Sequence, residues 1–520
     1  MSLHFGKERR ACMVERINGM GLRGIEAYKV EVEAAFSQGL PAFDVVGLPD
    51  AAVKESRDRV RSAMRNCGFD FPLGHITVNL APADIKKVGP LYDLPILAAL
   101  LKLSGQLAAE TDDAVFIGEL SLSGSVNSVN GVLPMTIEAQ KLGFKRIFVP
   151  YDNRAEAAVV KGIDVYPTKD VMALYRHLTG QAAIEKADPE ELTTTIGGFN
   201  VDFSQVKGQY EAKRAIEIAA AGSHNILLVG PPGSGKSMLA QRIPTILPDM
   251  TFEEMIETTK IHSIAGNIPS GVSLIDRRPF RAPHHTISPM GLAGGGTTPR
   301  PGEISLAHNG VLFLDEFPEF TRQTMEVLRQ PLEDGVVTIA RVSGTLSYPC
   351  SVTLVCAMNP CPCGYYGTGI RKCTCSPAAV SRYLNKISGP LLDRIDIHVE
   401  VPAVHYEELS SAAPAESSEK IRERVNKARR LQAERFEGRN ITANARIPSG
   451  DLHEFCVLDS RADSLLQKAF DKMGLSSRAY SKILKVARTI ADLEGSDRIR
   501  SEHVAEAVQY RSLDRKYWNR

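Results

Sequence analysis

The sequence lacks several features that would place it in a specialised class of protein. It holds nine cysteines, too few and too unevenly placed for a disulfide scaffold. No uninterrupted apolar run approaches the roughly 18 residues of a membrane-spanning helix. A net charge of +1 excludes a chain that is basic throughout, although basic groups can still be confined to one surface. The first twenty residues carry charges and no apolar stretch, so we expect no signal peptide and a cytosolic protein.

The composition is that of a globular protein, and the length implies several domains. Hydrophobic residues make up 43% of the chain and charged residues 24%, which excludes a fully disordered chain. At roughly 150 residues per domain, the 520 residues correspond to about three domains. Two polar, proline-containing segments, 184–199 and 405–420, indicate linkers. We therefore predict domains at 1–183, 200–402 and 417–512.

Each segment has its own pattern of apolar residues. The first combines strand-like runs at 27–35 and 76–80 with a helical repeat at 50–67, which indicates an α+β domain. The second places strands between helices, the pattern of a parallel α/β sheet. Its expected strands are 225–229, 311–314 and 353–357. The third segment is helical. Its expected helices are 421–431, 461–473, 477–494 and 501–510.

The motif G-x-x-x-x-G-K-S lies between an expected strand and an expected helix, as a phosphate-binding loop requires. Its glycines allow backbone amides to curl around phosphate oxygens. Lys236 can reach the β- and γ-phosphates, and Ser237 can hold Mg²⁺. We predict an ATP site formed by Gly230, Pro231, Pro232, Gly233, Ser234, Gly235, Lys236 and Ser237.

Two further polar groups follow buried strands of the second segment. Asp315 and Glu316 end the strand at 311–314, where ligands bind in parallel sheets. Asp315 would orient Mg²⁺, and Glu316 would polarise the attacking water. Asn359 ends the strand at 353–357 and could position that water beside the γ-phosphate. An Asp-Glu pair alone is common at the start of a helix. Because this pair follows a P-loop by about eighty residues, we interpret it as part of an ATP-hydrolysing site.

Two arginines could complete the site. Arg394 is a candidate arginine finger donated to a neighbouring subunit, and Arg478, at the start of a C-terminal helix, could contact the same γ-phosphate. The alternative for either residue is a surface salt bridge.

The order of these motifs resembles that of AAA+ ATPases. The stretches RAPHH at 281–285, PGEISLAHNG at 301–310 and SGPLLDR at 388–394 resemble the YifB/ComM family of magnesium-chelatase-like AAA+ ATPases, and the likeness runs from residue 1 to about 510. The resemblance implies an α/β ATPase core with a helical lid, assembled as a homohexamer, with inserts at about 278–302 and 334–350. It also implies a DNA motor that performs branch migration in homologous recombination, as in natural transformation. Its partners would be single-stranded and branched DNA and recombination proteins.

Residues from about 10 to 180 resemble the proteolytic domain of Lon-type proteases, through Gly89-Pro90 and the run 143–150. That chemistry needs a serine after Gly-Pro and a lysine that accepts its proton. The corresponding positions hold Leu91 and Leu133, so we predict no peptidase activity. The domain would hold the ring together, guide DNA or dock a partner.

Four cysteines are grouped as C-x-C-x₉-C-x-C. Four thiolates this close suit a tetrahedral structural zinc, although the usual pairs are C-x₂₋₄-C. A loop of reduced thiols is the alternative. We predict a structural Zn²⁺ held by Cys361, Cys363, Cys373 and Cys375.

Basic residues in the two inserts could track DNA phosphates in the pore of a ring. A solvated face is the alternative for the same charges. The candidates are Arg277, Arg278, Arg281, His284, His285 and Arg341. A magnesium-insertion chaperone and a protein-remodelling ATPase that ignores DNA are the competing functions.

Overall fold

The computed structural model describes residues 14–188, 200–269, 271–296, 299–341, 344–404 and 415–518. The chain forms two compact units. The first consists of Met1–Ile196 together with Met255–Asp276, and the second of Gly197–Glu254 together with Arg277–Arg520.

A mixed seven-stranded sheet forms the centre of the first unit, in the order β3-β4-β2-β1-β5-β8-β9. The strands are β1 (Val14–Arg23), β2 (Glu26–Ser37), β3 (Ala42–Val46), β4 (His75–Ala81), β5 (Ala114–Phe116), β8 (Arg146–Pro150) and β9 (Asp164–Thr168). β1, β2 and β4 pair antiparallel, and the remaining neighbours pair parallel. Along β2, Val30, Val32 and Ala34 are buried, because successive side chains of a strand point to opposite faces.

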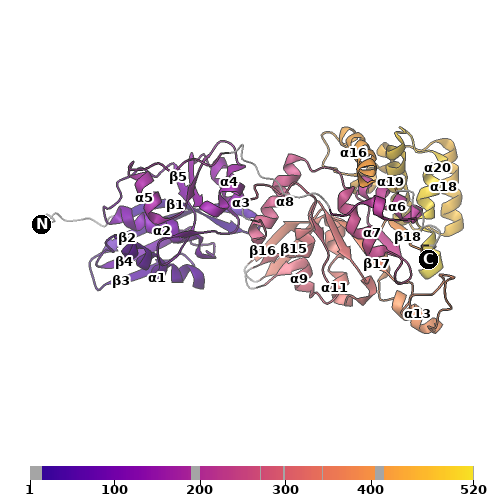
Figure 1. The fold of residues 1–520 in the computed structure, drawn as a ribbon, viewed down its shortest axis with the longest axis horizontal. Helices are drawn as coiled ribbons and strands as arrows, with labels where there is room; N and C mark the ends of the chain where they lie inside the picture. Colours follow the sequence, from indigo (N-terminus) through magenta and orange to yellow (C-terminus); the bar gives the residue numbers. More distant parts are fainter. Residues whose placement is uncertain are drawn as a thin grey trace. The chain divides into compact units, whose positions relative to one another are not determined.

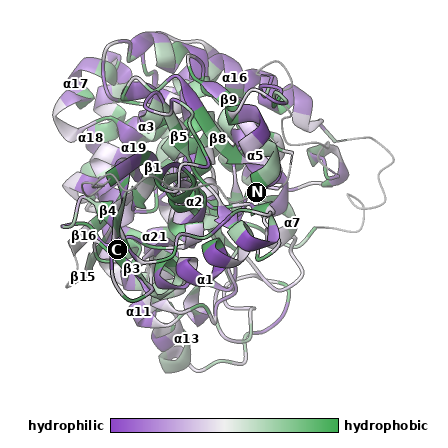
Figure 2. Ribbon diagram, turned by 90° about the vertical axis from the view of Figure 1, so that its left-hand side faces the viewer, coloured by the Kyte–Doolittle hydropathy of each residue, from purple (hydrophilic) through white to green (hydrophobic). Residues whose placement is uncertain are grey.

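The helices of this unit are α1 (Ala51–Asn66), α2 (Asp93–Leu103), α3 (Val132–Lys141), α4 (Arg154–Ala158) and α5 (Val171–Leu178) (Figure 1). The predicted helix at 50–67 is α1, which begins where the Asp50 side chain accepts from Val53 N–H. Val53, Val60 and Met64 lie on its buried face. Figure 2 shows β5 and β8 as strongly hydrophobic strands, in keeping with their buried side chains. The small strands β6 (Glu119–Leu120) and β7 (Val126–Asn127) complete the unit.

The second unit contains a five-stranded parallel sheet in the order β11-β14-β17-β10-β18. Its strands are β10 (Ile226–Val229), β11 (Phe280–Arg281), β14 (Val311–Leu314), β17 (Thr353–Met358) and β18 (Ile397–Glu400). β10, β14 and β17 are buried along their whole length, which explains why all their residues but Thr353 are apolar. The helices α6 (Tyr210–Gly222) and α7 (Lys236–Arg242) pack against this sheet (Figure 1).

Both predicted inserts are present and pack against each other. The first contains α9 (Pro289–Ala293), β12 (Gly294–Gly295) and β13 (Arg300–Pro301), and α10 (Glu303–Leu306) follows it. The second is a hairpin of β15 (Val336–Arg341) and β16 (Gly344–Pro349). Tyr348 of the hairpin donates to the Pro299 carbonyl of the first insert at 3.1 Å. Short helices follow the sheet strands: α11 (Arg322–Glu326), α12 (Arg329–Asp334), α13 (Pro377–Leu384) and α14 (Gly389–Leu392).

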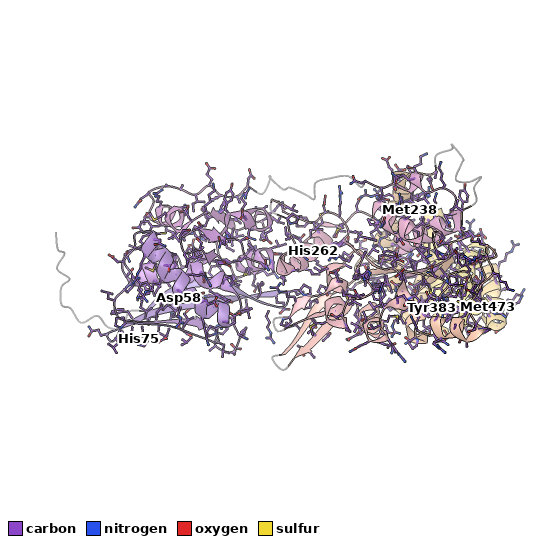
Figure 3. The ribbon with its side chains drawn as sticks, turned by 60° about the horizontal axis from the view of Figure 1, so that its bottom comes forward. Asp58, His75, Met238, His262, Tyr383 and Met473 are labelled. Carbon is purple, nitrogen blue, oxygen red and sulfur yellow. The ribbon has the colours of Figure 1, made fainter. Side chains whose placement is uncertain are left out.

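The C-terminal segment is helical and shares one apolar core with the sheet. Its helices are α16 (Ser418–Arg435), α17 (Leu452–Phe455), α18 (Ser460–Met473), α19 (Ser477–Glu494), α20 (Ser501–Gln509) and α21 (Ser512–Trp518). Val425 and Ile483 are buried in the same cluster as Ile226 of β10. Figure 3 marks Met473, where α18 ends before Gly474. None of the helices in the described ranges is both long and apolar enough to cross a membrane.

Residues 255–276, which we assigned to the ATPase core from the sequence, pack with the first unit. The chain enters this segment within α8 (Phe252–Ala265). Met255, Ile256 and Leu274 form an apolar cluster with Leu133 and Val159. The residues on both sides of the segment 255–276 belong to the second unit. No change in composition marks where the segment begins or ends, so the sequence did not reveal it.

Candidate nucleotide site

The loop between β10 and α7 has a backbone that only glycine tolerates at several positions. A side chain at Gly230 would place its Cβ 2.2 Å from the Val401 carbonyl oxygen. Gly233 and Gly235 have φ angles of +74° and +91°, in the left-handed region that favours glycine. The buried hydroxyl of Ser234 has no hydrogen-bond partner among the described residues. The loop therefore fits a phosphate-binding cradle, with a hydroxyl available to an anion.

Lys236 extends back along this loop. Its Nζ donates to the carbonyls of Gly230 at 2.8 Å and Pro231 at 2.9 Å, and to Asn359 Oδ1 at 3.2 Å. Burial lowers the pKa of Lys236 to about 8, against a smaller opposing effect of Asp315. A phosphate would give this poorly solvated ammonium an anionic partner.

Ser237, in the first turn of α7, and Asp315, directly after β14, lie together although they are far apart in the sequence. Ser237 Oγ donates to Asp315 Oδ2 at 2.6 Å, and Asp315 Oδ1 accepts from the Glu316 backbone N–H at 2.9 Å. A hydroxyl and a carboxylate are the oxygen ligands that Mg²⁺ prefers. The two residues thus fit the predicted magnesium site.

Glu316 has a partner that the sequence analysis did not identify. His285 Nδ1 lies 3.4 Å from Glu316 Oε2. From the sequence we interpreted His284 and His285 as loop or phosphate contacts, since nothing local links them to Glu316. The Glu316 side chain is 59% exposed, and its φ of +50° turns the chain sharply after β14. Its carboxylate is therefore accessible to water, next to Asp315, which contacts Ser237 of the P-loop.

Asn359 lies at the carboxyl end of β17, as predicted, and contacts Lys236. The Tyr383 side chain of α13, labelled in Figure 3 together with Met238 of α7, lies near the Asn359 backbone. Burial raises the pKa of Tyr383, which the Asn359 N–H lowers slightly, so this phenol stays neutral. The structure thus forms two contacting pairs, Lys236 with Asn359 and Ser237 with Asp315, which meet at the adjacent residues 236 and 237.

The two candidate arginines lie together in a separate cavity of about 510 Å³. Arg394 Nη2 is 2.6 Å from Glu333, and Arg478 Nη2 is 3.4 Å from the same carboxylate. Among the described residues that line this cavity, none belongs to the P-loop. Glu333 was not singled out from the sequence, because nothing local distinguishes it from any other helix-end glutamate. The roles of both arginines toward a neighbouring subunit stay predictions.

The four clustered cysteines have their sulfur atoms within 4.8 Å of one another. The Sγ atoms of Cys361, Cys363 and Cys373 are 3.4 to 3.8 Å apart. Zinc–sulfur bonds of about 2.3 Å in a tetrahedron place the sulfurs about 3.8 Å apart. Backbone N–H groups, first that of Thr374, lower the pKa of Cys363 to about 5. The donor set and its spacing therefore fit a tetrahedral metal ion.

This cysteine loop lies against the P-loop. Gly364 has a φ of +86°, and a Cβ there would lie 2.4 Å from Pro232 Cδ. The predicted zinc ligands therefore hold a segment that touches the nucleotide cradle directly.

The predicted DNA-binding arginines of the first insert already have partners. Arg278 pairs with Glu254 at 2.7 Å, and Arg281 pairs with Glu303 at 2.6 Å. Arg277 also interacts within the chain. The side chain of Arg341, at the end of β15, lies outside the described residues. Arg278 and Arg281 thus form ion pairs within the chain, and their role toward DNA stays a prediction.

The positions that correspond to a Lon-type dyad are apolar and buried. Leu91 is 7% exposed and Leu133 is fully buried. The two residues belong to different apolar clusters. Neither side chain can act as nucleophile or base.

Comparison with known proteins shows the family to which the chain belongs. Three family models match the chain. The model described as magnesium chelatase, subunit ChlI, matches residues 202–409, and the model described as subunit ChlI of Mg-chelatase matches residues 32–153. The model of the C-terminal region of magnesium chelatase subunit ChlI matches residues 415–511. The chain is 44% identical to the uncharacterized protein YifB of Escherichia coli over 494 residues, which is 95% of this chain and 96% of the relative. It is also 44% identical to the competence protein ComM of Haemophilus influenzae over 497 residues, again 95% of this chain and 96% of the relative.

A weaker likeness concerns the amino-terminal region. The Lon protease of Mycolicibacterium smegmatis is 25% identical over 164 residues, which is 29% of this chain and 21% of that protein. The fold is accordingly a Lon-protease-like α+β region, an AAA+ P-loop α/β core and a C-terminal helical lid. With family-model matches along most of its length and two relatives at 44% identity, the chain belongs to the YifB/ComM family of magnesium-chelatase-like AAA+ ATPases.

Proposed function

We propose that this protein is a cytoplasmic, hexameric, ATP-dependent DNA motor that drives branch migration during homologous recombination, as in natural transformation. The observation that carries the ATPase is the set of contacts that joins Lys236 to Asn359 and Ser237 to Asp315. The likeness to a competence protein over 95% of the chain supports DNA as the substrate, with recombination proteins as partners.

In this proposal the triphosphate of ATP binds the amides of residues 230–237, and Lys236 contacts its β- and γ-phosphates. Ser237 and Asp315 hold Mg²⁺, which neutralises phosphate charge when bound. Glu316 accepts a proton from the attacking water, and Asn359 orients that water. Arg394 and Arg478 contact the γ-phosphate held by the neighbouring subunit of the ring.

We further assign a structural Zn²⁺ to Cys361, Cys363, Cys373 and Cys375. The sulfur spacing supports this assignment. The zinc would clip the loop that follows Asn359 against Pro232 of the nucleotide cradle.

The two packed inserts support DNA translocation, because a stiff hairpin seated on a second loop can transmit a movement of the ATPase core to a strand in the pore. We propose no peptidase activity for the Lon-like region, since Leu91 and Leu133 replace both reactive groups. The matches to magnesium chelatase models favour one second candidate, a chelatase-type chaperone that does not act on DNA.

The test is ATP hydrolysis by the purified full-length protein, with and without single-stranded and branched DNA. We expect strong stimulation by DNA that disappears in Lys236→Ala, followed by strand displacement in a branch-migration assay. Robust hydrolysis that ignores every DNA would refute the DNA motor and favour the chelatase-type function. Absence of hydrolysis in the wild type would refute both.

A further inference from the structure

Arg394, the proposed finger, is held back by its own chain at every nitrogen of the guanidinium. Nε donates to the Arg329 carbonyl at 3.1 Å, Nη1 donates to the Pro390 carbonyl at 2.6 Å, and Nη2 pairs with Glu333 Oε2 at 2.6 Å. The side chain is only 10% exposed. An arginine held in this way cannot present a two-pronged N–H fork to a phosphate on a neighbouring subunit. It must first leave these contacts.

Glu333 binds the second arginine as well. Its other oxygen, Oε1, lies 3.4 Å from Arg478 Nη2. The Glu333 carboxylate therefore binds both arginines that we assign to the ATP of the neighbouring subunit. The Glu333 side chain is 47% exposed, so solvent weakens these contacts and they can be broken by a modest movement.

The helix that carries Glu333 connects directly to the hairpin. α12 ends at Asp334, Gly335 turns the chain with a φ of +67°, and β15 begins at Val336. The returning strand is tied to the same helix: Cys350 N–H donates to the Gly335 carbonyl at 2.8 Å, and the Cys350 thiol lies 3.7 Å from the Pro331 carbonyl. Both ends of the hairpin are thus fixed to α12.

The hairpin itself can act as a lever. β15 and β16 pair over six residues, from Val336 opposite Pro349 to Arg341 opposite Gly344. At about 3.4 Å per residue the paired strands reach about 20 Å from α12. A strand of DNA that pushes on the far end therefore applies its force to the helix that supplies Glu333 and the Arg329 carbonyl.

We propose that Glu333 is a positioning residue that withholds Arg394 and Arg478 until DNA displaces the β15–β16 hairpin. We call its contacts with the two arginines the Glu333 latch. Displacement of α12 removes the contacts of Arg394 with Glu333 and the Arg329 carbonyl, which leaves only the contact with the nearby Pro390 carbonyl, and the two arginines then contact the ATP of the neighbouring subunit. This mechanism rests on the proposed function and explains how DNA would stimulate hydrolysis.

The test measures ATP turnover of full-length Glu333→Gln without DNA. The amide keeps the size of the side chain but loses the charge that holds two guanidiniums. We expect DNA-free turnover to rise roughly fivefold, the effect of losing one half-exposed charged contact, with KM for ATP unchanged. DNA should then add little, so the stimulation ratio falls toward one. A merely structural role would instead lower turnover with and without DNA.

Glu454→Gln is the matched control, because Glu454 pairs with Arg439 at 3.2 Å and is 48% exposed. It should behave as the wild type. The double variant Glu333→Gln/Arg394→Ala should lose the gain. Ring assembly with ATP is checked by mass photometry. If Glu333→Gln does not assemble, Glu333→Asp replaces it: its carboxylate is too short to hold both arginines, and we expect a smaller rise in DNA-free turnover.

Unchanged or lower DNA-free turnover in the assembled Glu333 variants would overturn the latch, as would a rise that survives removal of Arg394. A wild type that ignores DNA would overturn the DNA trigger together with the proposed function. A failure confined to the Glu333 variants overturns the latch alone.

Discussion

Asp396 is a buried carboxylate that lies beside Lys482 and His224. Lys482 Nζ lies 2.8 Å from Oδ1, His224 Nδ1 lies 3.6 Å from Oδ2, and Asn225 N–H donates to Oδ2 at 2.9 Å. Burial alone would raise the pKa of Asp396, but Lys482 and His224 outweigh it and hold this pKa below its ordinary value. The ionised carboxylate therefore stabilises the folded state, and the stabilisation is present above the unfolded pKa of about 4.

We expect Asp396→Asn to lower the free energy of unfolding by about 3 kcal/mol at pH 7, because Lys482 loses its counter-charge in a buried place. The difference from the wild type should shrink as the pH falls below about 4, where the carboxylate of the unfolded wild-type chain takes up a proton while that of the folded chain stays ionised. Calorimetry of the transition of the second unit at several pH values measures this. Asp164→Asn, at an exposed pair with Lys186, is the control. An equal difference at all pH values would contradict the linkage.

Glu316 is assigned to the activation of water, not to binding. We expect Glu316→Gln to bind ATP and to assemble as the wild type does, while its kcat falls by a factor of roughly 100 or more, since an amide cannot accept the proton. Fluorescent-nucleotide titration and steady-state turnover separate the two effects. Unchanged turnover would remove Glu316 from this role.

At this scale the sequence predicted the residues that belong to contiguous motifs. Lys236, Ser237 and Asp315 follow strands whose ends must meet, so their contacts could be inferred from topology. His285 beside Glu316 and Glu333 beside Arg394 could not be inferred, because each contact joins loops whose relative position depends on tertiary packing.

Among the elements, the cysteine loop places a predicted metal site beside the predicted nucleotide site. Gly364 of this loop lies against Pro232 of the cradle, and Cys361 of the same loop is fully buried. Removal of a metal would let the four thiols separate and would release the loop from the P-loop. The site would then affect ATP binding although it holds no phosphate.

We expect about one zinc per chain by elemental analysis of the purified protein. Cys373→Ser should lose it and raise KM for ATP several-fold, with a smaller effect on kcat, because the cradle loses its support. Cys67→Ser, a half-buried thiol of the first unit, is the control that should change neither quantity. A zinc-free wild type with normal ATP binding would show that the thiols act without metal.

The sequence located most elements well. The expected strands at 311–314 and 353–357 are β14 and β17, and the expected helix at 477–494 is α19. These segments have strong apolar runs or clear periodicity, and α19 is capped by Ser476. The charges of the first insert were harder to interpret, since a local pattern does not show that Arg281 pairs with Glu303.

For the whole molecule, the division into units does not follow the order of the sequence. Residues 255–276 leave the second unit and complete an apolar cluster of the first, where Leu274 is 4% exposed. The ends of this segment stay close, because Glu254 and Arg278 form an ion pair at 2.7 Å. Each buried aliphatic side chain of this kind contributes about 1.5 to 3 kcal/mol when it leaves water.

We therefore expect a fragment starting at Gly197 to self-associate, since the loss of Leu133 and Val159 exposes Met255, Ile256 and Leu274 to solvent. A second fragment, in which a short Gly-Ser linker replaces 255–276, should stay monodisperse and bind ATP, because the linker has only a small gap to span. Analytical ultracentrifugation and nucleotide titration compare the two. If the unmodified fragment is equally monodisperse, the segment folds independently of the first unit and the ATPase boundary lies where the sequence placed it.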